Sequence, residues 1–230
     1  MTYSIAIGDK IYSSWSLRGW LLFEKFGIPV TEETARMYSP EFTAMLSNYG
    51  GGRTVPAIRF SEDEETVIVS DTLAIAETLV ERHPEKNMWP ANAAARGYAR
   101  SIVAEMHSGF MNIRNDCTMN LRHCYSGFQP SPEVQREISR LETIWTEART
   151  KWGKDGPWLF GSYSIADAFY APVATRLLTY DLPIAKLAAD YVQTTVNDPA
   201  FKRWRAEGLA ENYVQPGYDL DLPTVPWPET

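Results

Sequence analysis

Three serines stand close together near the N-terminus, at Ser13, Ser14 and Ser16. They follow a β-prone alternating segment over residues 3–7 and lie at the start of a predicted helix with an apolar stripe over residues 16–26. The start of a helix carries backbone N–H groups with a partial positive charge, so a thiolate, phosphate or carboxylate is stabilised there. The serine hydroxyls add hydrogen-bond donors. A serine before a helix is also the usual N-cap, so this segment alone fits either an anion site or a simple helix start.

Composition narrows the class of protein. The chain has 230 residues, of which 44% are hydrophobic and 22% are charged, as in a globular protein of one large or two modest domains. Its net charge of −7, without a basic block, argues against a nucleic-acid surface. The apolar runs fall well short of the ~18 residues that a membrane span needs, and the first residues show no targeting segment. We therefore expect a cytoplasmic protein with no nucleic-acid or membrane partner.

Cysteine and histidine spacing predicts no metal centre. Cys117 and Cys124 lie in a probable helix, whose rise would separate them by roughly 10 Å, too far for a disulfide. We expect both to be buried free thiols. The three histidines, His83, His107 and His123, have neither metal-ligand spacing nor paired cysteines nearby.

The first 83 residues alternate between strand and helix patterns. After the first helix we predict a strand, a short helix, a glycine turn, a hairpin with an acidic turn at 61–65, and another helix. These elements are expected over residues 30–37, 40–48, 50–52, 55–69 and 71–82. A βαβ unit followed by a ββα unit is the thioredoxin-like arrangement, so we predict an α/β thioredoxin-like domain over residues 1–83.

A change of pattern follows this domain. Residues 84–91 hold two prolines, which helix interiors avoid, and are predicted to form a linker. Residues 92–230 are predicted to form an all-α domain with an extended tail, which becomes Pro-rich and acidic from Gln215.

Within this second domain, apolar periodicity predicts long helices over residues 91–121 and 132–151. A further helix begins after Ser164, where Asp167 at the third helical position can return the hydrogen bond of the cap. Two more helices are bounded by Pro183 and Pro199.

Three short motifs accompany the serines. They are Val55-Pro56, Asp71-Thr72-Leu73-Ala74-Ile75 and Phe160-Gly161-Ser162-Tyr163-Ser164-Ile165-Ala166-Asp167. Together with Ser13-Ser14-Trp15-Ser16-Leu17-Arg18, they resemble motifs of the glutathione S-transferase superfamily over nearly the whole chain. The serine motif resembles the Ser-Ser-x-Ser-x-Arg pattern of the zeta class and its bacterial relatives, with Trp15 in place of the usual cysteine. The last motif resembles a structural element of the helical domain, so Asp167 is not expected to be a catalytic acid.

The resemblance implies roles for the serines and for the Val-Pro pair. Ser13 aligns with the catalytic serine that hydrogen-bonds the thiolate of glutathione. Ser14 and Ser16 are the alternative hydroxyls, or else caps of the helix. Val55 and Pro56 match a pair in which the proline is cis and the preceding backbone binds the cysteinyl unit.

The remaining glutathione contacts follow from the same resemblance. The helix start at Asp71 and Thr72 suits the γ-glutamyl group, with the Thr72 hydroxyl on its carboxylate and Asp71 on its ammonium. Arg53 either reaches the glycyl carboxylate or is a solvated loop arginine.

A segment of the helical domain is expected to face the cleft between the domains. His107 and Arg114 are seven residues apart and could share a helix face, where they either orient an acidic second substrate or are a structural histidine and a surface arginine. Trp15, Met106 and Phe110 either form an apolar wall for an electrophile or belong to the core.

The resemblance implies a homodimeric glutathione transferase that uses glutathione as cosubstrate in detoxification. A serine hydroxyl is too weak a base to remove the thiol proton, so its contribution is a hydrogen bond to the thiolate, aided by the helix dipole. The second substrate would be a small electrophilic or apolar molecule. One alternative is a glutathione-dependent cis-trans isomerase of the maleylacetoacetate type, which a basic second-substrate site would favour. Another is a non-enzymatic, transferase-like interaction protein, which failure to bind glutathione would favour.

Overall fold

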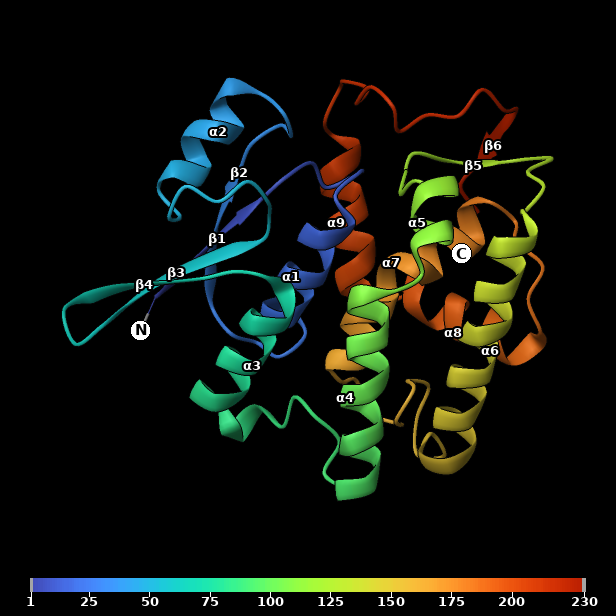
Figure 1. Ribbon diagram of the computed structural model, residues 1–230, viewed down its shortest axis with the longest axis horizontal. Coiled ribbons are helices and arrows are strands. Elements are labelled where there is room, and N and C mark those ends of the chain that lie inside the picture. The colour runs from blue at the N-terminus through green and yellow to red at the C-terminus, as the bar shows by residue number, and fades with distance from the viewer. Residues whose placement is uncertain (1, 229–230) are drawn as a thin grey trace.

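A computed structural model describes residues 2–228 and shows a four-stranded sheet beside a larger group of helices (Figure 1). The strands are β1 (Tyr3–Ile7), β2 (Val30–Thr34), β3 (Ala57–Glu62), β4 (Glu65–Val69), β5 (His123–Tyr125) and β6 (Thr224–Pro226). The first helices are α1 (Ser14–Glu24), α2 (Pro40–Ser47), α3 (Thr72–Arg82) and the short 3-10 helix η1 (Pro84–Lys86). The later helices are α4 (Ala93–Ser108), α5 (Met111–Asp116), α6 (Pro132–Trp152), α7 (Ile165–Thr179), α8 (Lys186–Val196) and α9 (Pro199–Leu209).

The sheet has the strand order β2-β1-β3-β4. β1 pairs in parallel with β2 and antiparallel with β3, and β3 pairs antiparallel with β4. Helices α1 and α3 pack against each other. α1 also contacts β1, α3 contacts β3, and α2 contacts β2. The predicted βαβ and ββα units are therefore confirmed, and helices follow them along the chain.

The β3–β4 hairpin is tighter than the sequence predicted. Glu62 pairs with Glu65, so only Asp63 and Glu64 form the turn. Both have positive φ, at 46° and 69°, as a two-residue type I′ turn requires. The strands therefore extend into the segment that we expected to be an acidic turn.

Helix α1 joins the sheet to the helical region. It packs against β1 and α3, and also against α7 and α9 (Figure 1). The Trp20 ring lies 5.1 Å from that of Trp204 in α9. The Arg18 guanidinium lies 4.5 Å from the Trp15 ring and 5.5 Å from that of Phe169 in α7. Since both sides of α1 are covered, buried residues extend around most of the helix.

Helix α7 is the centre of the helical region and is buried along nearly its whole length. Its start has the predicted capping box, in which Ser164 and Asp167 exchange hydrogen bonds. Asp167 also accepts hydrogen bonds from the Leu159 backbone, over 3.1 Å, and from the Tyr191 hydroxyl, over 3.0 Å. Because these partners come from outside α7, the buried carboxylate ties α7 to α8 and to the preceding loop.

The prediction of one helix over residues 91–121 was wrong. α4 ends at Ser108, and α5 begins at Met111. Gly109 has no room for a side chain, because a Cβ there would lie 2.8 Å from the Glu105 carbonyl oxygen. Phe110 then takes the left-handed conformation with φ 58°, which turns the chain into a new direction.

The two cysteines are consequently not on one helix. Cys117 ends α5, and Cys124 lies in β5. Both are buried free thiols, as predicted. Burial raises the pKa of Cys117 to about 12 and that of Cys124 to about 11, so neither is a thiolate at neutral pH. Within residues 2–228, no group of three or more His, Cys, Asp or Glu side chains is arranged to hold a metal ion.

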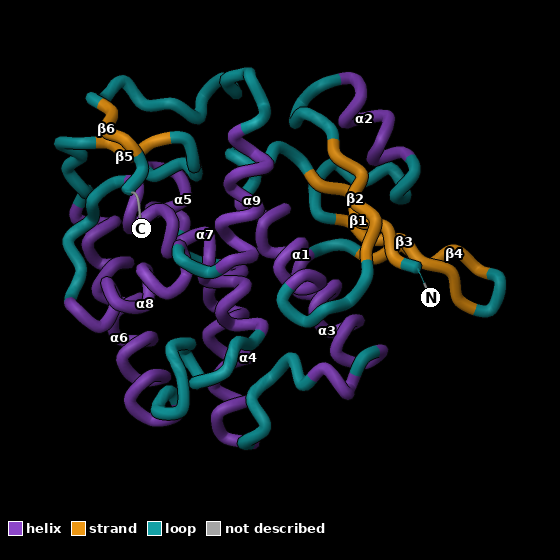
Figure 2. Tube along the Cα trace, turned by 180° about the vertical axis from the view of Figure 1, so that it is seen from behind, coloured by secondary structure: helices purple, strands orange, loops and turns teal. Residues whose placement is uncertain are grey.

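The tail contains a strand that the sequence did not predict. After α9 the chain crosses the helical region and reaches β6, which pairs antiparallel with β5 (Figure 2). The helical region therefore also holds a small two-stranded ladder, formed by segments about a hundred residues apart in sequence. No helix in the described part of the chain is long and apolar enough to cross a membrane.

Asp167→Asn is expected to remove a pH dependence of stability. Burial raises the pKa of Asp167 from 3.8 to about 6, so the native state binds its proton more tightly than the unfolded chain does between these values. The wild-type free energy of unfolding, relative to the variant, should be larger near pH 4 than near pH 7, by on the order of 3 kcal/mol.

Urea unfolding of both proteins at the two pH values measures this difference. The exposed Asp155 gives a matched control, because Asp155→Asn removes a carboxylate that is not buried. The raised pKa of Asp167 would be contradicted if the free energy of unfolding of the wild type, relative to that of Asp167→Asn, became larger as the pH rises.

Candidate functional site

A cavity of about 360 Å³ opens at the start of α1. On the sheet side, its walls come from the start of α1, from α2 and the loop before it, and from the loop before β3. On the helical side, they come from α5 and the chain that follows it, from α7 and from the C-terminal tail. Six residues of its described lining were predicted from the sequence: Ser13, Ser14, Trp15, Arg53, Val55 and Arg114. The predicted anion site and part of the predicted second-substrate site therefore share one cavity.

Ser13 is the N-cap of α1, a role that the sequence had left to Ser14 or Ser16. Its Oγ accepts a hydrogen bond from the Ser16 backbone N–H over 3.3 Å and donates one to the Ser16 Oγ over 2.7 Å. The Ser16 Oγ accepts in turn from the Gly8 backbone N–H over 2.9 Å. A continuous set of hydrogen bonds therefore runs from the end of β1, through Ser16, to the hydroxyl in the cavity wall.

The two alternative hydroxyls differ in their access to the cavity. Ser14 is the first residue of α1 and lies in the cavity wall, where 8% of the residue is exposed. Ser16 is fully buried and is not part of the described lining. An anion in this cavity would therefore meet the hydroxyls of Ser13 and Ser14 beside the first N–H groups of α1, which have no carbonyl partner within the helix.

The loop before β3 forms a second wall. The Val55–Pro56 peptide bond is cis, as the resemblance implied, and Val55 lines the cavity. Pro56 is buried against α1, where a Cβ on Gly19 would lie only 2.6 Å from its Cγ. Arg53 lines the cavity from the exposed part of the same loop. The missing side chain at Gly19 is thus what lets this loop approach the helix.

Asp71 and Thr72 lie at the start of α3, outside the described lining of the cavity. Asp71 is the N-cap, and its Oδ1 accepts hydrogen bonds from backbone N–H groups of the first turn over 3.0 and 3.5 Å. Its Oδ2 lies 3.2 Å from the His107 Nε2 of α4. The Thr72 Oγ1 is buried and has no hydrogen-bond partner among the described residues. The His107 ring lies 5.3 Å from that of Trp15, so it connects this helix start to the cavity wall.

Three arginines line the cavity, and its described lining contains no Asp or Glu. The Arg114 Nε donates to the Gly109 carbonyl over 2.9 Å, and its guanidinium lies 5.0 Å from the Trp15 ring. The Arg176 Nε donates to the Cys117 carbonyl over 2.7 Å. Burial lowers the pKa of Arg176 to about 10, which leaves it cationic at neutral pH. These hydrogen-bond partners are neutral carbonyls, and among the described residues neither guanidinium forms an ion pair with a carboxylate.

The predicted second-substrate residues are only partly brought together. His107 and Arg114 do not share a helix face, because the chain turns between α4 and α5, and His107 is outside the described lining. Met106 and Phe110 are buried and also lie outside it. Trp15 alone of the three predicted apolar residues lines the cavity.

Sequence reasoning missed much of the lining, namely Tyr12, Met37, Tyr38, Phe42, Thr54, Thr118, Met119, Arg176 and Tyr218. Arg176 had a detectable signal, because it is a buried charged residue in α7, whose one other charged residue is Asp167 of the capping box. Tyr218 had none, because it lies in a loop without periodicity.

The protein has two parts, a thioredoxin-like sheet region and a helical region, and the serines lie at the start of the helix that joins them. This is the fold of the thioredoxin-like transferases. Family models for the N-terminal and the C-terminal domain of glutathione S-transferases match residues 12–82 and 131–207. The chain belongs to the glutathione S-transferase superfamily.

Solved structures with this fold are similar over nearly the whole chain. A glutathione transferase homolog from Burkholderia, with bound glutathione, has a TM-score of 0.66 at 20% identity, covering 92% of this chain and 100% of its own. Maleylacetoacetate isomerase from Anaeromyxobacter dehalogenans, with glutathione in its active site, has a TM-score of 0.64 at 20% identity, covering 95% and 98%. Glutathione transferase Omega 2S from Trametes versicolor has a TM-score of 0.66 at 18% identity, covering 91% and 95%. No curated protein sequence matches this chain.

Gly19→Ala is expected to destabilise the protein, although alanine normally favours a helix over glycine by about 1 kcal/mol. The new Cβ would lie 2.6 Å from the Cγ and 2.8 Å from the Cβ of Pro56, and a proline ring cannot rotate away. Overpacking of this kind costs about 1–3 kcal/mol.

Gly97→Ala in α4 is the matched control, because a Cβ there meets nothing within 4 Å. It should be neutral or stabilising in urea unfolding. If both variants were equally stabilised, the close contact between α1 and Pro56 would not constrain the site.

Proposed function

We propose that the protein binds glutathione in this cavity and transfers its thiolate to an electrophile. The observation that carries the proposal is the start of α1, where two hydroxyls and helix N–H groups face a cavity lined by arginines. Glutathione has one thiol and two carboxylates, so its chemistry matches these donors. Two of the similar structures hold glutathione, which supports the same ligand here.

We place the tripeptide between α1, the loop before β3 and α3. The thiol lies at the start of α1, the cysteinyl backbone pairs with Val55, and the glycyl carboxylate lies near Arg53. The γ-glutamyl group extends beyond the described lining of the cavity to the start of α3, where the Thr72 hydroxyl has no protein partner within the described chain. The Asp71 Oδ1 is occupied by the helix cap, so Oδ2, which also faces His107, remains for the ammonium.

Ser13 is proposed to stabilise the thiolate with support from Ser16. In this structure the Ser13 hydroxyl donates to Ser16. When a thiolate accepts that hydrogen instead, the Ser16 hydroxyl can turn and donate to the Ser13 Oγ, while the Gly8 N–H still holds Ser16. Every donor then points toward the sulfur, and each bond polarises the next. A thiol pKa lowered by one unit corresponds to about 1.4 kcal/mol, which one hydrogen bond to a charged group can supply.

The transfer step needs no further catalytic group. The sulfur lone pair forms a C–S bond at the electrophilic carbon, and the leaving group departs with its bonding electron pair. With an aryl chloride the products are the thioether and chloride, and the thiol proton goes to solvent. The cavity contributes by holding thiolate and electrophile together.

A second candidate is the cis-trans isomerisation of an unsaturated dicarboxylate, and the arginines favour it. Arg114 and Arg176 bring positive charge into a cavity whose described lining has no acidic residue. The thiolate would add to the carbon–carbon double bond, rotation would follow about the new single bond, and loss of the thiolate would regenerate glutathione. A maleylacetoacetate isomerase structure, at 19% identity, holds dicarboxyethyl glutathione and citrate in its active site. With Arg114 and Arg176 in the lining, a carboxylate-bearing electrophile would suit either candidate.

Ser13→Ala is expected to raise the pKa of the bound thiol by about one unit and to lower turnover at neutral pH about tenfold. The glutathione dissociation constant should change little, because the lost bond favours the thiolate rather than the tripeptide. Since Ser13 also caps α1, the variant should lose about 1 kcal/mol of stability as well.

Ser14→Ala is the matched variant, because Ser14 lines the cavity without capping the helix. Thiolate absorbance against pH and turnover are measured for both. A larger loss in Ser14→Ala would assign the sulfur contact to Ser14. Calorimetry that shows no heat with millimolar glutathione would reject the proposed function itself.

Arg176→Gln is expected to weaken selectively the use of a carboxylate-bearing electrophile. The probe is a chlorodinitrobenzoate, compared with its uncharged amide. Loss of a hydrogen-bonded ion pair should raise the KM for the benzoate about tenfold to a hundredfold, while the KM for the amide changes little. Arg100→Gln is the control, because Arg100 is an exposed arginine outside the described lining. Equal effects on the two electrophiles would show that Arg176 does not recognise a carboxylate.

A further inference from the structure

The chain after α9 does not leave the molecule but crosses back over the cavity. We call residues 211–222 the C-terminal strap. It runs from the end of α9 to β6, along one edge of the helical region and past α5 (Figure 1). The pairing of β6 with β5 holds its far end. The strap is therefore fixed at both ends by regular structure.

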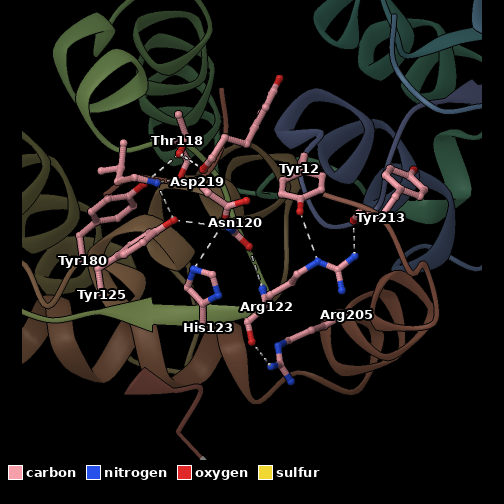
Figure 3. Close-up of polar contacts among 12 residues, drawn as sticks. Tyr12, Thr118, Asn120, Arg122, His123, Tyr125, Tyr180, Arg205, Tyr213 and Asp219 are labelled. Carbon is pink, nitrogen blue, oxygen red and sulfur yellow. Dashed lines mark hydrogen bonds and ion pairs between the residues drawn. The ribbon is translucent and has the colours of Figure 1, made fainter. Parts of the chain in front are cut away.

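Arg122 anchors the first part of the strap. Its Nη2 donates to the Glu211 carbonyl over 2.7 Å and to the Tyr213 carbonyl over 2.9 Å. Its Nε donates to the Tyr12 hydroxyl over 3.2 Å, so the guanidinium lies between Tyr12 and Tyr213 (Figure 3). Because Tyr12 directly precedes Ser13, one side chain connects the strap to the segment that carries the proposed catalytic hydroxyl.

Asp9 provides a second connection to the same segment. The Tyr213 hydroxyl donates to the Asp9 carboxylate. That carboxylate also accepts from the Met37 backbone N–H over 2.9 Å, and the Asp9 carbonyl accepts from the Ser13 N–H over 2.8 Å. Asp9 is fully buried, so its hydrogen bonds are costly to lose. The strap is therefore part of the packing that fixes the start of α1.

Tyr218 is the strap residue that lines the cavity. Its ring lies 5.2 Å from the Tyr12 ring, and its hydroxyl lies 3.5 Å from that of Tyr38. Its carbonyl accepts from the Thr118 Oγ1 over 2.8 Å, and the Asp219 that follows accepts from the Asn120 Nδ2 over 2.6 Å (Figure 3). These contacts hold the Tyr218 carbonyl and the residue that follows it, so the position of the ring is defined by the strap as well as by the neighbouring side chains.

We infer that Tyr218 is a specificity-determining residue, whose ring packs against the planar, conjugated part of the electrophile while the carboxylate lies toward Arg176. The inference rests on the proposed function and names the kind of second substrate that the cavity accepts. Tyr12 and Tyr38 supply further aromatic surface on the same cavity, and Arg176 supplies the charge. A planar, unsaturated or aromatic carboxylate fits this combination better than a flexible aliphatic one, because a flat ring face is best covered by another flat group.

The test compares glutathione with its S-aryl conjugate, formed chemically from chlorodinitrobenzoate, as ligands in calorimetry. Tyr218→Leu should weaken binding of the conjugate about tenfold and leave the dissociation constant of glutathione within about twofold. Tyr218→Phe keeps the ring and should bind the conjugate nearly as wild type does. Val214→Ala is the control within the strap, because Val214 is 59% exposed and is not in the described lining.

Three outcomes are distinguishable. Wild-type protein that binds neither ligand would reject the proposed function, and this inference with it. Normal glutathione binding together with unchanged conjugate binding in Tyr218→Leu would overturn this inference alone. Equal weakening of both ligands in Tyr218→Leu would also overturn it, because Tyr218 would then act by holding the strap and the start of α1 in place.

Discussion

The start of α1 is the point on which the rest of the site depends. A buried helix cannot leave its first N–H groups without partners, and here they are met partly by the Ser13 cap. The Asp9 carbonyl and the Gly8 N–H fix the turn that leads from β1 into the helix, through Ser13 and Ser16. The same hydrogen bonds that end the strand therefore orient the hydroxyls. The remaining donors of the helix start face a cavity, which is where an anionic ligand stabilises them further.

The second physical feature is an uneven distribution of charge. The chain has a net charge of −7, yet arginines line the cavity and its described lining contains no acidic residue. Arg18, behind Trp15, is fully buried, and burial lowers its pKa well below the usual value. The positive charges of Arg114 and Arg176 lower the pKa of Arg18 further, so the guanidinium groups of Arg18, Arg114 and Arg176 are close enough to repel one another. A carboxylate bound near Arg114 and Arg176 would relieve this repulsion, so electrostatics would favour an anion here in addition to any individual hydrogen bonds.

Local patterns in the sequence were sufficient for the sheet region. Alternation predicted β1, and two β-prone runs around an acidic turn predicted the β3–β4 hairpin, whose turn is shorter than expected. In the helical region, the spacing of Ser164 and Asp167 predicted the capping box that the structure confirms. The break between α4 and α5 was missed, because apolar residues continue at helical spacing through Met106, Phe110 and Ile113. The extended backbone of Gly109 and the left-handed conformation of Phe110 show that the helix has ended.

The candidate site was predictable mainly where its residues belong to short motifs. Ser13, Ser14 and Val55 were found because each motif is continuous in sequence. Arg176 and Tyr218 come from a distant helix and from the strap, and only the tertiary structure brings them to the same cavity. The pairing of β5 with β6 is likewise a long-range contact between two three-residue strands, too short for a period-two pattern to be visible.

The most direct test of the account is the pKa of the glutathione thiol when it is bound to the wild-type protein. Thiolate absorbance is titrated against pH for free glutathione and for glutathione in the presence of excess protein. The account predicts that the bound thiol titrates at least about one unit below the free thiol, because hydroxyl and helix N–H donors favour the charged form. A bound thiol that titrates at the same pH as free glutathione, or at a higher pH, would contradict it.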